Sequence, residues 1–196
     1  GLTTPDPVHL HATLQELALE GVQHVALEAS SHGLDQYRLD GLQLTAAGFT
    51  NLTRDHLDYH GSMEAYRASK LRLFEELLPR GGTAVVNTAA AEHDTIAAIA
   101  QERGLKLISY GLEHGNLRTA RIEARGHGFA LELEVMGHRH AVDFPLAGRF
   151  QIENALCALG LVIGAGGDPA EAARAMGGLS DVPGRMELVG HIAGDA

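Results

Sequence analysis

Residues 49–74 read FTNLTRDHLDYHGSMEAYRASKLRLF, and this run decides how the chain is organised. Its first half gathers polar and ionisable side chains in the cluster TRDHLDYH, which ends at His60. Ser62 then offers a good N-cap, so a helix is predicted to begin beside it. Apolar residues recur at helical spacing and predict one buried face, made of Met63, Tyr66, Leu73 and Leu77. Lys70 falls on the same face.

Lys70 admits two interpretations. A lysine on such a face usually lays its methylene stem along apolar surface and extends its ammonium group into water. Alternatively, a pocket that excludes water lowers the pKa of the amine, so that the neutral amine can react. The DHLDYH cluster immediately before the helix favours the second interpretation.

The composition describes one ordinary globular domain. The 196 residues are 45% hydrophobic and 20% charged, and this length suffices for a single core. A formal net charge of −10 argues against a nucleic-acid-binding face, which would be basic. Cys157 is the only cysteine, so an internal disulfide is impossible and a reducing compartment is indicated. Because the sequence has no signal peptide and no membrane-spanning apolar run, we expect a cytoplasmic protein without a membrane partner.

Two predicted strands should deliver polar groups to one edge of a sheet. The short apolar run 22–29 predicts a buried strand with Glu28 near its carboxyl end. Residues 42–50 predict the next strand, which leads into the polar cluster at 51–60. Ligands of open α/β sheets bind at the carboxyl ends of the strands. We therefore expect Glu28, an imidazole of the cluster and Lys70 to converge there.

The rest of the pattern predicts an α/β fold. An N-terminal helix is predicted to begin at Asp6-Pro7, which are strong start signals. Strands at 83–87 and 105–110 enclose a helix at 90–103, an alternation that is typical of a largely parallel sheet flanked by helices. Three further segments alternate apolar and polar residues between glycine turns and predict a small antiparallel subsheet without chemistry of its own. These segments are 118–125, 129–136 and 139–146.

Four runs of residues carry a family resemblance. They are EASSHGLDQYR at 28–38, FTNL at 49–52, RDHLDYHG at 54–61 and ASK at 68–70. Together they resemble the central, ATP-binding domain of the Mur ligases, and the resemblance extends from Thr3-Thr4 to the run GRME at 184–187. Within that family, the runs are most similar to the members that add the third amino acid to UDP-N-acetylmuramoyl-L-alanyl-D-glutamate.

The resemblance implies an ATP-dependent amide ligase of peptidoglycan precursor synthesis. In such a ligase, the D-glutamyl carboxylate attacks the γ-phosphate of ATP and forms an acyl phosphate. The amino group of the incoming residue, diaminopimelate or lysine, then displaces phosphate. The implied partners are therefore the UDP-N-acetylmuramoyl dipeptide, ATP and an amino acid, with Mg²⁺ as cofactor.

The resemblance also assigns roles to individual residues. Magnesium would be bound by Glu28, His56 and Lys70, of which His56 and Lys70 are catalytic. The family's lysine is carbamylated by carbon dioxide, a reaction that needs a neutral amine and supplies the oxygen ligands that magnesium prefers. The residues that would bind the UDP-muramoyl substrate are Thr3, Thr4, Ser30, Gln36 and Arg38. The residues that would contact the nucleotide are Asn154 and Arg185.

No phosphate-binding loop of the form G-x-x-x-x-G-K-[ST] occurs in the sequence. In the family, that loop lies immediately before the position of Thr3, and the domain that binds the incoming amino acid follows the position of Ala196. We therefore expect residues 1–190 to be a central domain that lacks its phosphate-binding strand, loop and helix, and residues 191–196 to begin a linker. Such a part of a ligase is expected to be inactive on its own.

Two other functions also fit the residues. A metal-dependent hydrolase could use a compact ligand set made of Asp55, His56, Asp58 and His60. Tightly bound zinc or manganese and hydrolysis without ATP would indicate this function, which leaves Lys70 without a role. The chain could also be a folded, non-catalytic binding module, which would bind nucleotide weakly or not at all.

Overall fold

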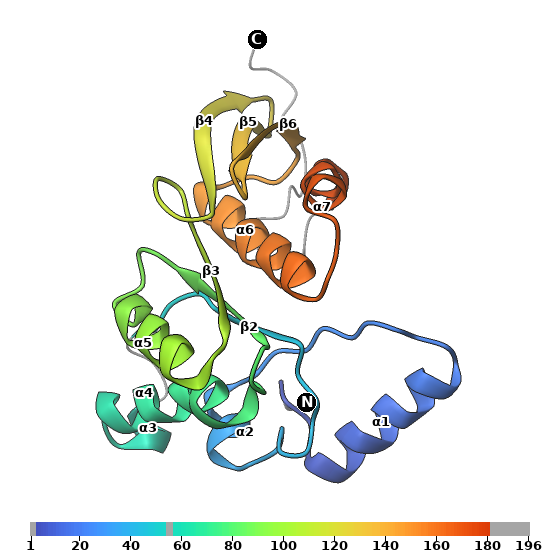
Figure 1. Ribbon diagram of the computed structural model, residues 1–196, viewed down its shortest axis with the longest axis vertical. Coiled ribbons are helices and arrows are strands. Elements are labelled where there is room, and N and C mark those ends of the chain that lie inside the picture. Colours follow the sequence, from blue (N-terminus) through green and yellow to red (C-terminus); the bar gives the residue numbers. More distant parts are fainter. Residues whose placement is uncertain (1–2, 54–56, 181–196) are drawn as a thin grey trace, which may run out of the picture.

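The computed structural model describes residues 3–53 and 57–180 and shows one mixed sheet with helices packed against it (Figure 1). Six strands follow one another across the sheet in chain order. They are β1 (Ala46–Phe49), β2 (Thr83–Asn87), β3 (Lys106–Gly111), β4 (Leu117–Arg125), β5 (Gly128–Val135) and β6 (His138–Phe144). Pairing is parallel from β1 to β4 and antiparallel from β4 to β6. The predicted α/β class, with its parallel and antiparallel parts, is confirmed.

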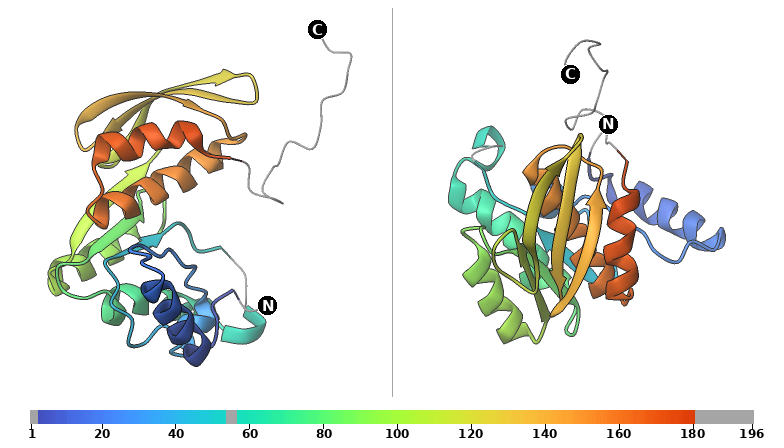
Figure 2. Two further views of the ribbon diagram at one scale, coloured as in Figure 1. Left: turned by 90° about the vertical axis from the view of Figure 1, so that its right-hand side faces the viewer. Right: turned by 90° about the horizontal axis from the view of Figure 1, so that it is seen from above.

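The antiparallel strands extend the parallel sheet and do not form a separate layer. Strand β4 joins the sheet by pairing with β3 at Tyr110–Leu117 and Gly111–Arg118. Helix α7 (Pro169–Ala175) packs against β5 and β6, and Figure 2 shows it lying beside the longer helix α6 (Arg149–Gly164).

Strand β2 lies at the centre of the parallel part and is buried at all five positions. Its side chains point alternately to the two faces of the sheet. Val85 belongs to the core that includes the buried side of α6. Ala84 and Val86 belong to a second core, together with Ile96 of α5 (His93–Arg103). The two helices therefore cover opposite faces of β2.

Helix α6 approaches the sheet closely because glycines face it. A Cβ atom on Gly160 of α6 would lie 2.5 Å from Cγ1 of Val85. Likewise, a Cβ atom on Gly48 of β1 would lie 2.9 Å from Sγ of Cys157. These contacts leave no room for a larger side chain at either glycine.

The remaining helical elements are α1 (Pro7–Leu19), α2 (Ser31–Asp35), α3 (Leu57–His60), α4 (Met63–Arg72), the π-helical turn η1 (Leu73–Leu77) and the 3₁₀ turn η2 (Met176–Gly178). Three of these helices, α1, α2 and α4, begin at a residue whose side chain caps them. Asp6 accepts a hydrogen bond from the backbone N–H of His9 at 3.1 Å, and Ser62 accepts one from Ala65 at 3.1 Å. Both predicted helix starts are therefore confirmed.

The predicted buried strand at 22–29 is wrong. Residues 22–28 are exposed and form no strand, and the exposed fractions of Val22, Val25 and Leu27 are 40%, 48% and 38%. An apolar run predicts burial, but a strand also needs a neighbouring strand to complete its hydrogen bonds. Among residues 3–53 and 57–180, no strand pairs with this segment. The predicted strand at 42–50 is present but shorter, because only Ala46–Phe49 pair with β2.

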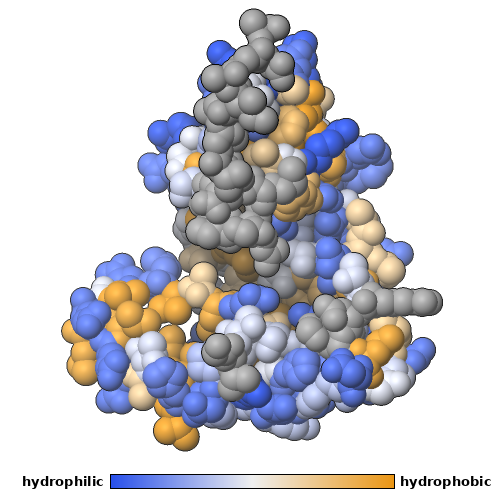
Figure 3. All heavy atoms as spheres, turned by 180° about the vertical axis from the view of Figure 1, so that it is seen from behind, coloured by the Kyte–Doolittle hydropathy of each residue, from blue (hydrophilic) through white to orange (hydrophobic). Residues whose placement is uncertain are grey.

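Helix α1 packs lightly on the rest of the molecule. Leu10 is its only buried residue, whereas Val8 and Leu19 are 80% and 81% exposed. Figure 3 accordingly shows apolar side chains on the surface around this helix. None of the helices described here has the length and apolarity needed to cross a bilayer.

Candidate active site

Thr4 connects the start of the chain to the segment around Glu28. Its side chain is buried, and its Oγ1 donates to the backbone oxygen of Glu28 at 2.8 Å. The same atom accepts from the backbone N–H of Ser30 at 3.0 Å and lies 2.9 Å from Ser30 Oγ. A hydroxyl donates one hydrogen bond and accepts two, so Ser30 is the donor of the third bond. All three hydrogen bonds that the Thr4 hydroxyl can make therefore hold residues 28–30 in place.

Gly33 allows Thr4 to come this close. Ser30 Oγ accepts from the backbone N–H of Gly33 at 3.0 Å and caps α2. A Cβ atom on Gly33 would lie 2.7 to 2.9 Å from three side-chain atoms of Thr4. The glycine therefore fixes the distance between α2 and the buried threonine.

Replacing Gly33 with alanine should destabilise this arrangement. The added methyl group would push Thr4 away and weaken its hydrogen bonds to Glu28 and Ser30. Alanine gains about 1 kcal/mol over glycine in a helix, and we expect the clash to outweigh it, with a net loss of about 1–2 kcal/mol. Denaturant unfolding measures this loss. Gly178→Ala is the matched control, because nothing lies within 4 Å of a Cβ atom there. Equal stability of the two variants would contradict the packing argument.

Lys70 lies on α4 beside the same segment. Its Nζ donates to the backbone oxygen of Ala29 at 3.3 Å. Burial lowers the pKa of Lys70 below its ordinary value, and the charge of Glu28 opposes this shift. The environment is thus that of a partly enclosed amine, which favours the neutral form that carbon dioxide requires.

Two of the three predicted magnesium ligands, Glu28 and Lys70, lie in the described part of the chain. Glu28 and Lys70 lie close enough for their charges to interact, whereas His56 lies outside the described residues. An ammonium group repels a cation, so this pair fits magnesium only when Lys70 carries oxygen atoms, as a carbamate does. Within the described ranges, no group of three His, Cys, Asp or Glu side chains is arranged to hold a metal ion.

Arg38 and Gln36 follow α2 and lie against each other. Arg38 donates from Nη1 to the backbone oxygen of Thr4 at 2.7 Å and from Nε to Gln36 Oε1 at 3.0 Å. Gln36 is exposed and Arg38 is partly exposed. An oriented guanidinium group at the surface suits the binding of an anionic ligand.

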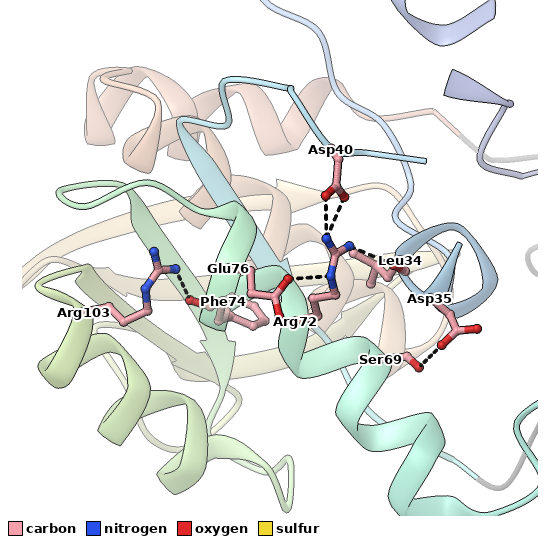
Figure 4. Close-up of polar contacts among 8 residues, drawn as sticks. All are labelled: Leu34, Asp35, Asp40, Ser69, Arg72, Phe74, Glu76 and Arg103. Atoms are coloured by element: carbon pink, nitrogen blue, oxygen red, sulfur yellow. Dashed lines mark hydrogen bonds and ion pairs between the residues drawn. The ribbon is translucent and has the colours of Figure 1, made fainter. Parts of the chain in front are cut away.

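Tyr59 and Asp35 extend this contact to α4. Gln36 Nε2 donates to Tyr59 Oη at 2.9 Å, and Tyr59 donates to Asp35 Oδ2 at 2.8 Å. Asp35 also accepts from Ser69 at 3.3 Å through Oδ1, as Figure 4 shows. This chain of hydrogen bonds runs from Arg38 to Ser69, which immediately precedes Lys70 on α4. Sequence reasoning missed Asp35 and Tyr59, although both lie within the runs that carry the family resemblance.

The structure gathers most of the predicted site residues that it describes. The gathered residues are Thr4, Glu28, Ser30, Gln36, Arg38 and Lys70. Thr3 adjoins them but is exposed. Asn154 is exposed on α6 and donates to Gln151 Oε1 of its own helix at 3.2 Å, so it is not part of this cluster of contacts. His56 and Arg185 lie outside the described residues.

A comparison against known families agrees with the fold. A family model described as the Mur ligase middle domain matches residues 1–162. The chain therefore belongs to the Mur ligase family.

Three of the relatives that match this chain share one name within the family. The chain is 48% identical over 197 residues to the UDP-N-acetylmuramoyl-L-alanyl-D-glutamate--2,6-diaminopimelate ligase of Bradyrhizobium diazoefficiens, a match that covers 97% of this chain and 40% of that protein. It is 50% identical over 190 residues to the ligase of the same name from Agrobacterium fabrum, with coverages of 97% and 39%. A solved structure of a ligase of this name superposes with a TM-score of 0.87 at 35% identity, over 97% of this chain and 39% of that one. The chain thus spans about 40% of the length of the curated relatives it matches.

Proposed function

We propose that this chain is the central domain of an ATP-dependent ligase that joins 2,6-diaminopimelate to UDP-N-acetylmuramoyl-L-alanyl-D-glutamate, a step of peptidoglycan precursor synthesis. The names of the relatives support this substrate pair. The observation that carries the proposal is the place of Lys70. Its amine donates to the backbone oxygen of Ala29, next to Glu28, and the hydrogen-bond chain that begins at Arg38 ends at Ser69, the residue before Lys70.

The proposed reaction forms an amide bond in two steps. An oxygen of the D-glutamyl carboxylate attacks the γ-phosphorus of ATP, ADP leaves, and an acyl phosphate results. An amino group of 2,6-diaminopimelate then attacks the acyl carbon, and phosphate leaves with the electron pair of the broken C–O bond. ATP and the UDP-muramoyl substrate are both anionic, so the site must provide cations and N–H donors to bring them together.

Different residues of this chain would bind the substrate, the nucleotide and the magnesium ion. The UDP-muramoyl dipeptide would be bound by Thr3, Ser30, Gln36 and Arg38. Thr4, which the resemblance also assigns to substrate binding, would act indirectly, because its buried hydroxyl is fully bonded to residues 28–30. The nucleotide would be contacted by Asn154 and Arg185. Magnesium would be held by Glu28, His56 and a carbamylated Lys70, and it would supply positive charge near the transferred phosphoryl group. The fixed guanidinium group of Arg38 orients the acceptor carboxylate or the diphosphate by paired hydrogen bonds.

Membership of the Mur ligase family supports the ligase over the alternative functions. The hydrolase would require Asp55 and His56, which lie outside the described residues, together with Asp58 and His60 of α3. It would also give no role to Lys70, whose amine is partly enclosed beside Glu28.

A ligation assay with the full-length ligase tests the proposal. ADP and the amide product should form only when ATP, magnesium, the UDP-muramoyl dipeptide and the amino acid are all present, and 2,6-diaminopimelate should react faster than lysine. Hydrolysis of a substrate without ATP, accompanied by bound zinc, would favour the hydrolase. A folded protein that binds neither nucleotide nor UDP-muramoyl dipeptide would contradict the ligase.

A further inference from the structure

A buried arginine at the end of α4 holds the segment that carries Gln36 and Arg38. Arg72 is 8% exposed, and each of its three guanidinium nitrogens donates a hydrogen bond. Nη1 donates to the backbone oxygen of Leu34 at 2.9 Å, and Nη2 donates to both carboxylate oxygens of Asp40 at 2.7 and 2.8 Å. Figure 4 shows these contacts converging on one side chain.

The third nitrogen ties Arg72 to its own helix. Nε donates at 2.7 Å to Glu76, which lies four residues further along in η1. This bond fixes the plane of the guanidinium group, so that Nη1 and Nη2 face Leu34 and Asp40. Arginine suits this role because its donors form a rigid planar fork.

Tyr37 shows that residues 34–40 need such support. Its φ angle is +57°, in the left-handed region that a residue with a Cβ atom rarely adopts. The residue is 61% exposed, so burial in a core does not hold it. Instead, the guanidinium carbon of Arg72 lies 4.1 Å from the centre of the tyrosine ring, a cation–π contact. Arg72 therefore contacts this segment at its two ends and at its middle.

Lys70 precedes Arg72 by two residues on the same helix, which corresponds to a rise of about 3 Å. We propose that Arg72 is a positioning residue that fixes Gln36 and Arg38, and with them the UDP-muramoyl substrate, relative to Lys70. This role rests on the proposed ligase function. The Ser69–Asp35 hydrogen bond joins the same two elements from the other side of Lys70 and supports the arrangement.

Arg103 provides a matched control. It donates from Nη1 to the backbone oxygens of Phe74 at 2.8 Å and Leu78 at 3.0 Å. Like Arg72, Arg103 donates hydrogen bonds to backbone carbonyl groups, and Figure 4 shows both side chains. Its hydrogen bonds reach the end of η1 and not residues 34–40, so its loss should affect stability without displacing Gln36 and Arg38.

The experiment compares Arg72→Met and Arg103→Met in the full-length ligase. For Arg72→Met we expect the KM for the UDP-muramoyl dipeptide to rise roughly tenfold or more, because several charge-assisted hydrogen bonds are lost, while the KM for ATP changes less than about twofold. Backbone amides of residues 36–42 should exchange with deuterium at least about tenfold faster. Arg103→Met should change neither the ratio of the two KM values nor exchange at these amides.

Two outcomes would overturn the positioning role. One is unchanged exchange at 36–42 in Arg72→Met, and the other is a rise of both KM values by the same factor. If Arg72→Met does not fold, Asp40→Asn keeps the bonds of Arg72 to Leu34 and Glu76, and the same two outcomes apply to it. Absence of ligase activity in the wild-type protein would overturn the proposed function, and the exchange comparison would still decide whether Arg72 holds the segment.

Discussion

Replacing Lys70 with alanine in the full-length ligase should reduce kcat at least about a hundredfold, the size of effect seen when a group that stabilises transferred charge is removed. The amine lies against the backbone oxygen of Ala29 and interacts with Glu28. Without it, no carbamate can form and Glu28 loses the partner that would share a magnesium ion. A steady-state assay of ADP release measures the change.

The same variant offers a rescue test of the carbamate. A short carboxylate such as acetate or formate can enter the space that the lysine side chain leaves and replace its oxygen atoms, so it should restore part of the activity of Lys70→Ala. The matched control is Lys106→Ala, because Lys106 is the only other lysine and is exposed on β3. This control should retain wild-type activity. Full activity of Lys70→Ala without an added carboxylate would contradict a catalytic role of a carbamate on Lys70.

Replacing Arg38 with alanine should raise the KM for the UDP-muramoyl dipeptide about ten- to a hundredfold, because a hydrogen bond to a charged group contributes about 1.5–3 kcal/mol. The side chain is oriented by Thr4 and Gln36 and reaches the surface. Arg38→Lys should recover only part of the affinity, since an ammonium group keeps the charge but loses the planar fork. Initial rates at varied concentrations of each substrate measure the effect.

The control for Arg38 is an arginine in the antiparallel part of the sheet. Arg125 of β4 is exposed and pairs with Asp143 at 2.6 Å, and exposed ion pairs contribute little. Arg125→Ala should therefore leave the KM of every substrate unchanged. A KM for the UDP-muramoyl dipeptide that is equal in Arg38→Ala and Arg125→Ala would exclude Arg38 from substrate binding.

Local signals predicted much of the fold, because the chemistry of a few residues decides it. Asp6 and Ser62 cap helices wherever their side chains can reach a free N–H group, and both helices begin there. The apolar middle of β2, residues 84–86, favours burial on both faces, which places the strand at the centre of the parallel strands. The glycine turns and alternating residues of β4–β6 likewise fit only an antiparallel meander.

The segment before α2 could not be predicted in this way. The valine, alanine and leucine residues of 22–29 favour a strand, as those of β2 do, but a strand depends on a pairing partner that local composition does not reveal. The carboxyl end of this segment is instead held by hydrogen bonds with Thr4, which lies 24 residues before Glu28 and 26 residues before Ser30 in the sequence. The left-handed conformation of Tyr37 is equally invisible in the sequence, since tyrosine has no preference for it.

In the candidate site, too, some residues could be predicted from the sequence and others could not. The family resemblance singled out Glu28, Ser30, Gln36, Arg38 and Lys70, and the structure places these residues in one neighbourhood. It could not single out Arg72, because an arginine after an apolar helical face usually lies in solvent. Only the tertiary packing of α4 on residues 34–40 buries this side chain and shows what it holds.

The most direct test of the central claim is to detect the carbamate on Lys70. The full-length ligase is equilibrated with ¹³C-labelled bicarbonate, and its ¹³C NMR spectrum is compared with the spectra of Lys70→Ala and Lys106→Ala. We expect a carbamate resonance that is present in the wild type and in Lys106→Ala and that is missing from Lys70→Ala. Identical carbamate regions in the wild type and Lys70→Ala would contradict carbamylation of Lys70.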